Sequence, residues 1–275
     1  MDAVLAGREI SVAYQQNMII PPMDVKIEKE CITSIIGPNG CGKSTLLKAL
    51  SRTLPIRSGQ VLLDGRLIAQ MPTAEVAKQM AILPQGPQAP AGLTVEELVS
   101  YGRYPHQKGF GRLDREDREA IRWALHITHM EELAGKNIDA LSGGQRQRAW
   151  IAMALAQDTQ VILLDEPTAG QDFRHYTDIM EFLRGLNARG VTVVMITHDM
   201  HLMLEYTRRA LVFCDGRLIA DRTAAAVLCD PALVEQAALK ETSLYTLANR
   251  CGIAPAQEFV ERFIEQDREV REGGR

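Results

Sequence analysis

The stretch GPNGCGKST, residues 37–45, constrains the fold of this chain more than any other. It matches the pattern GxxxxGK[ST], and it lies between CITSII (31–36), a continuous apolar run, and the helical pattern LLKALS (46–51). A buried strand, a glycine-rich loop and a helix in this order form a phosphate site, because the loop turns its backbone N–H groups toward an anion at the helix start. The stretch therefore predicts an α/β fold with a site for a phosphorylated ligand.

Each residue of this loop has an expected part in holding a nucleotide. Lys43 is expected to reach the β and γ phosphates, and Ser44 to offer its hydroxyl to a magnesium ion. The glycines let the backbone approach the phosphate oxygens closely. We expect the whole loop to contact the nucleotide, through Gly37, Pro38, Asn39, Gly40, Cys41, Gly42, Lys43, Ser44 and Thr45.

Three other segments place polar side chains where apolar strands end. VILLDEP (161–167) ends in Asp165, expected to hold magnesium, and Glu166, placed to accept a proton from an attacking water. Gln85 and His198 end the strand-like runs AILPQ and VMITH, and so fall at the same edge of the sheet. A lone histidine after a strand is more often structural, so His198 alone is a weak signal.

The chain's apolar patterns predict a parallel sheet with additions at its ends and in its middle. CITSII, VILLDE and VTVVMITHD are continuous apolar runs, typical of strands covered by helices on both faces. REISVAY (8–14) and MDVKIEKE (23–30) alternate and predict an antiparallel flank, with Pro21 and Pro22 between its strands. LVFCDGRLIAD (211–221) has a central Asp-Gly and predicts a hairpin.

Helical patterns predict two further parts. Residues 87–158 show helical periodicity and predict a lobe inserted into an α/β domain of residues 1–230. Residues 231–275 predict a C-terminal helical extension, in which FVERFI places Phe259, Val260, Phe263 and Ile264 on one docking stripe.

A second glycine-rich helix start occurs at LSGGQ, residues 141–145. Ser142, Gly143 and Gly144 leave backbone N–H groups free for a phosphate, and the following helix is expected to be amphipathic with Trp150 on its apolar side. One nucleotide cannot easily be held by both loops of one chain, because each belongs to a different lobe. The second start therefore predicts a head-to-tail pair of chains that sandwiches two ATP molecules. An ordinary helix N-cap is the alternative.

Charge and composition argue against nucleic acid as a partner and against a membrane span within the chain. A net charge of −4 and the absence of any block of like charges argue against nucleic-acid binding through a basic surface. No run of 18 apolar residues occurs, and the first residues lack the pattern of a signal peptide. We expect a cytosolic chain whose membrane role, if any, comes through a partner. Five cysteines scattered without a CxxC pair favour neither a zinc site nor a disulfide framework.

Together these motifs resemble those of the ATP-binding cassette (ABC) family, in the family's order, over residues 5–225. GPNGCGKST resembles its Walker A motif, LPQ its Q-loop, LSGGQ its signature, VILLDE its Walker B motif, TAGQD its D-loop and THD its H-loop. The resemblance implies a RecA-like core with an inserted helical lobe, and a cassette dimer that closes on ATP at the cytoplasmic face of the membrane. It also implies a separate membrane permease and, indirectly, a substrate-binding protein.

The resemblance assigns roles residue by residue. It makes Tyr14 the residue that stacks on adenine, Glu166 the catalytic base and His198 the contact to the γ phosphate. Gln85 and Ser44 share the magnesium, Ser142 to Gln145 form the signature contact, and Asp172 couples the paired sites.

The transported solute is predicted less directly. Residues 30–165 are similar to ATPases of importers for iron siderophores, haem and cobalamin, whereas the later residues look more like energy-coupling-factor ATPases for vitamins, such as a thiamine precursor or cobalamin, and metal ions. We give the first likeness more weight, because in this family the helical lobe and the segment after Gln85 meet the permease. An ABC ATPase outside transport is a further alternative, although such proteins usually carry long coiled coils or two cassettes.

Overall fold

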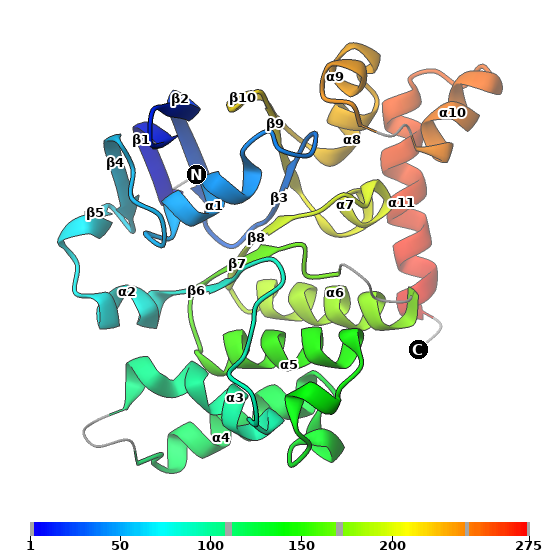
Figure 1. Cartoon of the computed structure of the whole chain (residues 1–275). Helices are drawn as coiled ribbons and strands as arrows, with labels where there is room; N and C mark the ends of the chain where they lie inside the picture. Colours follow the sequence, from blue (N-terminus) through cyan, green and yellow to red (C-terminus); the bar gives the residue numbers. More distant parts are fainter. Residues whose placement is uncertain (1–2, 108–111, 169–172, 240–241, 274–275) are drawn as a thin grey trace.

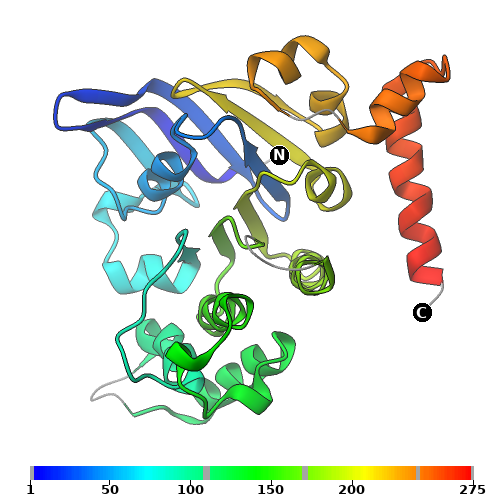
Figure 2. The same cartoon turned by 45° about the vertical axis from the view of Figure 1, so that its right-hand side comes forward.

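The computed structural model describes residues 3–107, 112–168, 173–239 and 242–273. Within these residues the strands form two sheets (Figures 1 and 2). The smaller sheet has the order β2-β1-β4-β5, with β1 (Ala3–Tyr14), β2 (Asn17–Glu28), β4 (Ser58–Leu63) and β5 (Arg66–Leu67). The larger sheet has the order β10-β9-β3-β8-β7-β6, with β3 (Ile32–Ile36), β6 (Met80–Leu83), β7 (Val161–Asp165), β8 (Thr192–Ile196), β9 (Arg209–Cys214) and β10 (Arg217–Arg222).

The larger sheet is parallel except for β10, as the continuous apolar runs predict. Every residue of β3, β7 and β8 is buried, because helices or the smaller sheet cover both faces. Alternate strand residues serve different cores: Leu163 packs toward α1 (Lys43–Leu50) and the smaller sheet, and Leu164 toward α5 (Gly143–Ala156) and α6 (Phe173–Asn187). The α/β fold with a parallel sheet and an antiparallel flank is confirmed.

The antiparallel flank forms as predicted, but its turn lies elsewhere. Strands β1 and β2 meet at Tyr14 and Asn17, so Pro21 and Pro22 lie inside β2 and do not separate the strands. Proline lacks the N–H that a strand donates, so it is tolerated in a strand that lies at the edge of a sheet. Strand β2 is such an edge strand. The predicted hairpin of β9 and β10 is confirmed.

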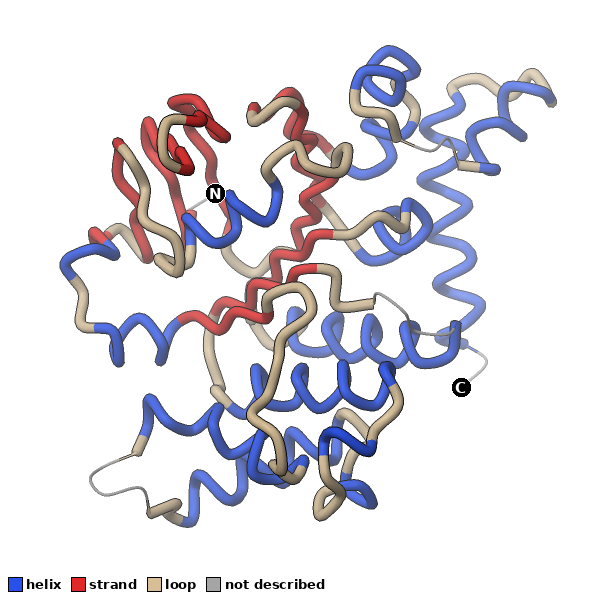
Figure 3. The backbone as a smooth tube through the Cα atoms, in the orientation of Figure 1, coloured by secondary structure: helices blue, strands red, loops and turns tan. Residues whose placement is uncertain are grey.

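The chain between β6 and β7 is helical wherever the structure describes it. It holds α3 (Val95–Ser100), η2 (Tyr101–His106), α4 (Arg115–Ile127), η3 (Glu131–Leu133), η4 (Ile138–Ala140) and α5. Figure 3 shows the loop after β6 descending from the sheet to these helices. The exact lobe limits, 87–158, stay a prediction.

Helix α5 differs from the amphipathic helix that its sequence predicts. From Ala149 to Ala156 only Met153 is not buried. The reason is position, since α5 packs against α3 and α4 and against strand β6, and Figures 1 and 2 show it between those helices and α6. A helix at the centre of its lobe is apolar on most sides.

The remaining helices cover the sheets and the end of the chain. They are η1 (Ile68–Gln70), α2 (Thr73–Gln79), α7 (Met200–Tyr206), α8 (Ala224–Leu228), α9 (Pro231–Gln236), α10 (Ser243–Arg250) and α11 (Ala256–Gly273). The predicted stripe on α11 is partly wrong. Val260 is buried against α8 and its neighbours, and Ile264 packs there too, but Phe263 is 45% exposed beside Phe259, since the contact face is centred on Val260.

Candidate functional site

The glycine-rich loop joins β3 to α1 as the sequence predicts. Gly40 and Gly42 have φ angles of 76° and 108°, in the region that favours glycine. Gly42 caps α1 without any side-chain hydrogen bond to the helix. The first N–H groups of α1 therefore point toward an open loop, which is the arrangement that attracts an anion.

The loop is shaped by strand β9 as much as by its own sequence. A Cβ atom added to Gly37, whose φ is 144°, would lie 1.8 Å from the carbonyl oxygen of Phe213. The Cys41 thiol donates to that same oxygen at 3.2 Å and is buried, and burial raises the pKa of this thiol. The Cys41 side chain therefore lies behind the loop, so that only its backbone is placed for phosphate.

Lys43 is buried at the start of α1 and holds the loop closed on itself. Its Nζ atom donates to the carbonyl oxygens of Gly37 at 2.8 Å and Pro38 at 2.7 Å. A bound phosphate is a stronger partner for the ammonium group than two neutral carbonyls, because charge-assisted hydrogen bonds are roughly twice as strong. The lysine is thus positioned to move to a ligand.

Strand β7 delivers two carboxyl groups to the site. Asp165 is 2% exposed, and its Oδ1 atom has no hydrogen-bond partner among the described residues. Burial raises the pKa of this carboxyl, although a hydrogen bond with the Ser44 side chain opposes the rise. An unpaired buried carboxylate oxygen beside a serine hydroxyl fits a magnesium ion, which prefers oxygen ligands.

Glu166 lies one residue beyond the strand, in a left-handed conformation with φ of 53°. Its backbone N–H donates to the Ile196 carbonyl of β8 at 3.1 Å, which fixes the turn. Such a conformation is uncommon for a residue other than glycine and is found often at functional sites.

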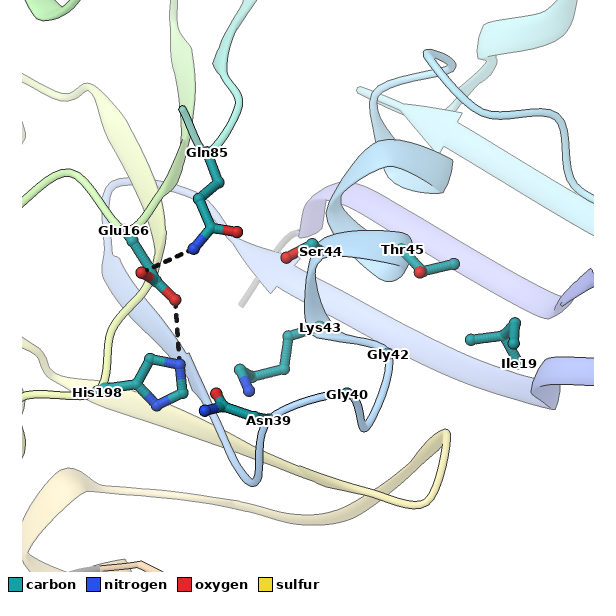
Figure 4. Close-up of a pocket in the computed structure, with 10 residues that line it drawn as sticks. All are labelled: Ile19, Asn39, Gly40, Gly42, Lys43, Ser44, Thr45, Gln85, Glu166 and His198. Atoms are coloured by element: carbon teal, nitrogen blue, oxygen red, sulfur yellow. Dashed lines mark hydrogen bonds and ion pairs between the residues drawn. The ribbon is translucent and has the colours of Figure 1, made fainter. Parts of the chain in front are cut away.

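Gln85, Glu166 and His198 come together although they are far apart in sequence (Figure 4). Gln85 Nε2 donates to Glu166 Oε2 at 2.9 Å, and His198 Nε2 lies 3.1 Å from Glu166 Oε1. The ends of β6, β7 and β8 supply these residues at one edge of the sheet, as predicted. Both carboxylate oxygens are therefore held by neighbours.

A cavity of about 600 Å³ contains most of the predicted loop and cluster residues. Its lining comprises Ile19, Asn39, Gly40, Gly42, Lys43, Ser44, Thr45, Gln85, Glu166 and His198. Tyr14 is half exposed at the end of β1 and is not among these residues. The sequence analysis missed Ile19, which follows the β1–β2 turn as an ordinary strand residue and gives no separate signal.

The second glycine-rich helix start lies outside this cavity. Ser142 caps α5: its Oγ atom accepts from the Gln145 N–H at 3.3 Å, and Gln145 Oε1 accepts from the Ser142 N–H at 3.1 Å. The first backbone hydrogen bond of α5 is donated by the Arg146 N–H to the Ser142 carbonyl, so the N–H groups of Gly143 and Gly144 make no hydrogen bond within the helix. A Cβ atom added to Gly143 would have no atom within 4 Å apart from its chain neighbours and the backbone of its own helix. Asp172, the predicted coupling residue, lies outside the described residues.

The fold and the cavity define a nucleoside-triphosphate-binding protein of the phosphate-loop class. Residues 20–169 match the family described as ABC transporter. The iron(3+)-hydroxamate import ATP-binding protein FhuC of Bacillus subtilis (strain 168) is 49% identical over 82% of this chain and 84% of its own length. The probable siderophore transport system ATP-binding protein YusV of the same organism is 47% identical, over 83% of this chain and 84% of its own.

The chain belongs to the ABC transporter family. It is the ATP-binding subunit of such a transporter, and its ATPase activity is coupled to transport. A longer relative also aligns with the C-terminal extension: a putative ABC transporter ATP-binding protein of Enterococcus faecalis (strain ATCC 700802 / V583) is 41% identical, over 98% of this chain but 47% of its own length.

Solved structures agree with the family. The dimeric structure of MJ0796, a bacterial ABC transporter cassette, superposes with a TM-score of 0.72 and 27% identity, covering 80% of this chain and 98% of that one. The structure of cbiO1 from Clostridium perfringens, part of the ABC transporter complex cbiONQ, superposes with a TM-score of 0.72 and 28% identity, covering 86% of this chain and 94% of that one. No helix in the described part of the chain is long and apolar enough to cross a membrane.

Proposed function

We propose that this chain hydrolyses ATP for an importer of iron-siderophore complexes, at the cytoplasmic face of the membrane and docked on a separate permease. The assignment of the solute is supported by the 49% identity to the iron(3+)-hydroxamate import protein over 82% of the chain. The same solute is in the name of the siderophore transport relative. A substrate-binding protein takes part only indirectly, through the permease, and nucleic acid has no part.

The proposed reaction takes place between two chains. The triphosphate of each ATP lies in the loop of residues 37–45 of one chain, and the start of α5 in the other chain covers it. The separation of the two helix starts supports this arrangement, because Ser142 is not part of the cavity that holds Lys43. The dimeric MJ0796 structure supports it as well. A homodimer is the simplest form, and a pair of different cassettes has the same geometry.

Each residue of the cluster has a proposed step. Water attacks the γ phosphorus, the bond from this phosphorus to the β-γ bridging oxygen breaks, and Glu166 takes a proton from the water, so that ADP and phosphate leave. Gln85 and His198 orient Glu166 through its two carboxylate oxygens. Lys43 neutralises phosphate charge, and Tyr14 is proposed to stack on the adenine. Asp165, Ser44 and Gln85 would hold magnesium, which would supply positive charge to the phosphate oxygens.

Uptake measurements test the solute. Cells that lack the gene should lose import of a radioactive ferric hydroxamate, wild-type protein should restore it, and Glu166→Gln should not. Cobalamin import in the same cells is the control and should stay unchanged. Loss of cobalamin import with normal iron import would overturn the iron assignment.

A vitamin or metal-ion ATPase of the energy-coupling-factor kind is the second candidate. It is supported by the resemblance of the residues after the Walker B motif to that group. The Enterococcus relative, described as a putative ABC transporter ATP-binding protein, also matches the C-terminal extension. The membrane protein that co-purifies with the chain separates the two candidates. A many-span permease supports iron-siderophore import, whereas a small substrate-binding membrane subunit with a transmembrane coupling protein supports the second.

A further inference from the structure

The side chain of Gln157 hydrogen-bonds the C-terminal end of α5 to α2 and to the parallel sheet. Gln157, the residue that ends α5, donates from Nε2 to the carbonyl oxygens of Ala77 at 2.5 Å and Met80 at 3.1 Å. Ala77 lies in α2, and Met80 is the first residue of β6, the strand that leads to Gln85. One amide group thus joins the far end of the helix that begins at Ser142 to the start of the strand that ends at the cavity.

Segment η2 also holds this end of α5, and it packs against α2 as well. Arg103 donates to the Ala156 carbonyl at 2.7 Å, and His106 Nε2 to the Gln157 carbonyl at 2.8 Å. The last carbonyls of a helix lack partners within it, and α5 has no basic residue in its own last turn, so η2 supplies the Arg103 cation and the His106 ring N–H as donors. Gly102 packs so closely that an added Cβ would lie 2.2 Å from the Met153 carbonyl oxygen.

The cation in this joint is itself held firmly. Arg103 is buried and pairs with the buried Asp117 of α4, with Nε 2.9 Å from Oδ1. Helix α4, segment η2 and the end of α5 therefore form one body. This body packs against β6 through α5 and against α2 through η2, and the Gln157 amide adds hydrogen bonds to both elements.

The geometry points to Gln157 as a positioning residue: we propose that its amide sets the tilt of α5 and thereby places Ser142, Gly143 and Gly144 against the nucleotide of the partner chain. Helix α5 has 14 residues and is about 21 Å long. A tilt of about 5° at Gln157 moves the other end by about 2 Å. Misplacement by about 1 Å costs up to about a hundredfold in rate when reacting groups must meet.

A second contact between α5 and the nucleotide side of the sheet is weaker. Gln147 Nε2 donates to the Pro167 carbonyl at 3.4 Å, near the upper limit for a hydrogen bond. At this length the bond restrains the start of α5 only weakly. The two shorter bonds at the opposite end therefore set the orientation.

The test replaces the donor without changing the volume of the side chain. Gln157→Met fills the same space but cannot donate, and Gln70→Met, at an exposed glutamine of η1, is the matched control. We expect Gln157→Met to lower kcat about tenfold, while affinity for ADP, which one chain binds alone, stays within about twofold. Gln70→Met should leave both unchanged. Should Gln157→Met fail to fold, Gln157→Ser, which admits water to the two carbonyls, serves for the same measurements.

This inference rests on the paired arrangement proposed above, and a second readout separates the two. In the Glu166→Gln background, Gln157→Met should raise the ATP concentration needed for dimer formation about tenfold, and Gln157→Lys, which keeps a donor, should restore it. If Glu166→Gln alone never dimerises with ATP, the paired arrangement is wrong. If it dimerises and Gln157→Met leaves kcat and dimer formation unchanged, or lowers ADP affinity equally, the role of Gln157 is wrong.

Discussion

The two glycine-rich helix starts of this chain differ in what surrounds them. The start of α1 is enclosed: Lys43, Ser44 and the end of β7 line or border the same cavity, and no side chain caps the helix. The start of α5 is open, and Ser142 caps it with Gln145 as reciprocal partner. An enclosed start can bind a triphosphate by itself. An open start with a rigid cap can only complete a site that something else provides.

The comparison assigns different tasks to two similar sequences. In the proposed reaction, residues near α1 exchange internal bonds for ligand bonds, as Lys43 would exchange its bonds to the carbonyls of Gly37 and Pro38. Residues near α5 keep their internal bonds and present a fixed surface. Substitutions at the first should change nucleotide affinity and chemistry, and those at the second should leave the nucleotide affinity of a single chain unchanged and lower turnover in the dimer.

The largest effect is expected from Glu166→Gln. Loss of the proton acceptor should lower phosphate release about 10²- to 10⁴-fold, while nucleotide affinity stays near that of the wild type. Size-exclusion chromatography with ATP should then show a dimer. In the proposed arrangement, the two helix starts that hold each nucleotide of this dimer come from different chains. A variant with wild-type turnover would remove Glu166 from its role as base.

The packing at the C-terminal end of α5, and with it the stability of the chain, should depend on the buried ion pair of Arg103 and Asp117. Burial raises the pKa of the Asp117 carboxyl, but hydrogen bonds from the Arg103 side chain and the Asp114 N–H outweigh it, so this pKa lies below its usual value. Asp117→Asn leaves Arg103 buried without its counter-ion and should lower the free energy of unfolding by about 3–5 kcal/mol at pH 7, measured by urea denaturation. Glu116→Gln, at the exposed neighbour, is the control.

The pH dependence of that difference follows from the lowered pKa. The folded carboxyl holds its proton less tightly than the unfolded one, so its stabilisation is complete above the unfolded value of about 3.9. It disappears as the pH falls through the lower folded pKa. The gap between wild type and Asp117→Asn should therefore narrow only in this acidic window. A gap that narrows near pH 7 would contradict the pairing.

Mixing two inactive chains tests whether the two starts belong to different copies. Lys43→Ala should weaken nucleotide binding by about a hundredfold, because a charge-assisted contact to phosphate is lost. Ser142→Arg should block the open start. A mixture of the two should regain part of the ATPase activity, since the mixed dimer keeps one intact composite site. Activity that stays at the level of either variant alone would count against shared sites.

The smallest effect concerns the cap of α5. Ser142→Ala should destabilise the chain by about 1 kcal/mol, as the loss of a helix cap does, and should lower turnover as well. Thr94→Ala removes the equivalent cap of α3, which also forms a reciprocal pair with Glu97, and should cost similar stability with normal turnover. Equal turnover in the two variants would mean that Ser142 is only a cap.

Much of the cavity could be predicted from sequence, because strand ends and loop motifs are local signals. The apolar runs that end at Gln85, Asp165 and His198 are short and continuous, and parallel strands bring their ends to one edge. The burial of α5 could not be predicted, since periodicity records one buried face and not the number of neighbours. Strand β2 was predicted to start after Pro22, because an edge position is not visible in the residues themselves.

Contacts across the chain were missed for a similar reason. Ile19 lines the cavity and Gln157 bonds to α2 and β6 only because distant segments fold next to each other. Neither residue belongs to a motif. Long-range contacts of single polar or apolar side chains leave no periodic signal, so the structure was needed to find them.

The close approach of the Phe213 carbonyl to Gly37 has a consequence for the nucleotide loop as a free peptide. Its curvature is imposed by a strand from another part of the chain, some 170 positions away in sequence. A synthetic peptide of residues 37–45 would lack the contact with β9 and would populate many conformations. Its phosphate affinity would therefore be far lower than that of the whole protein.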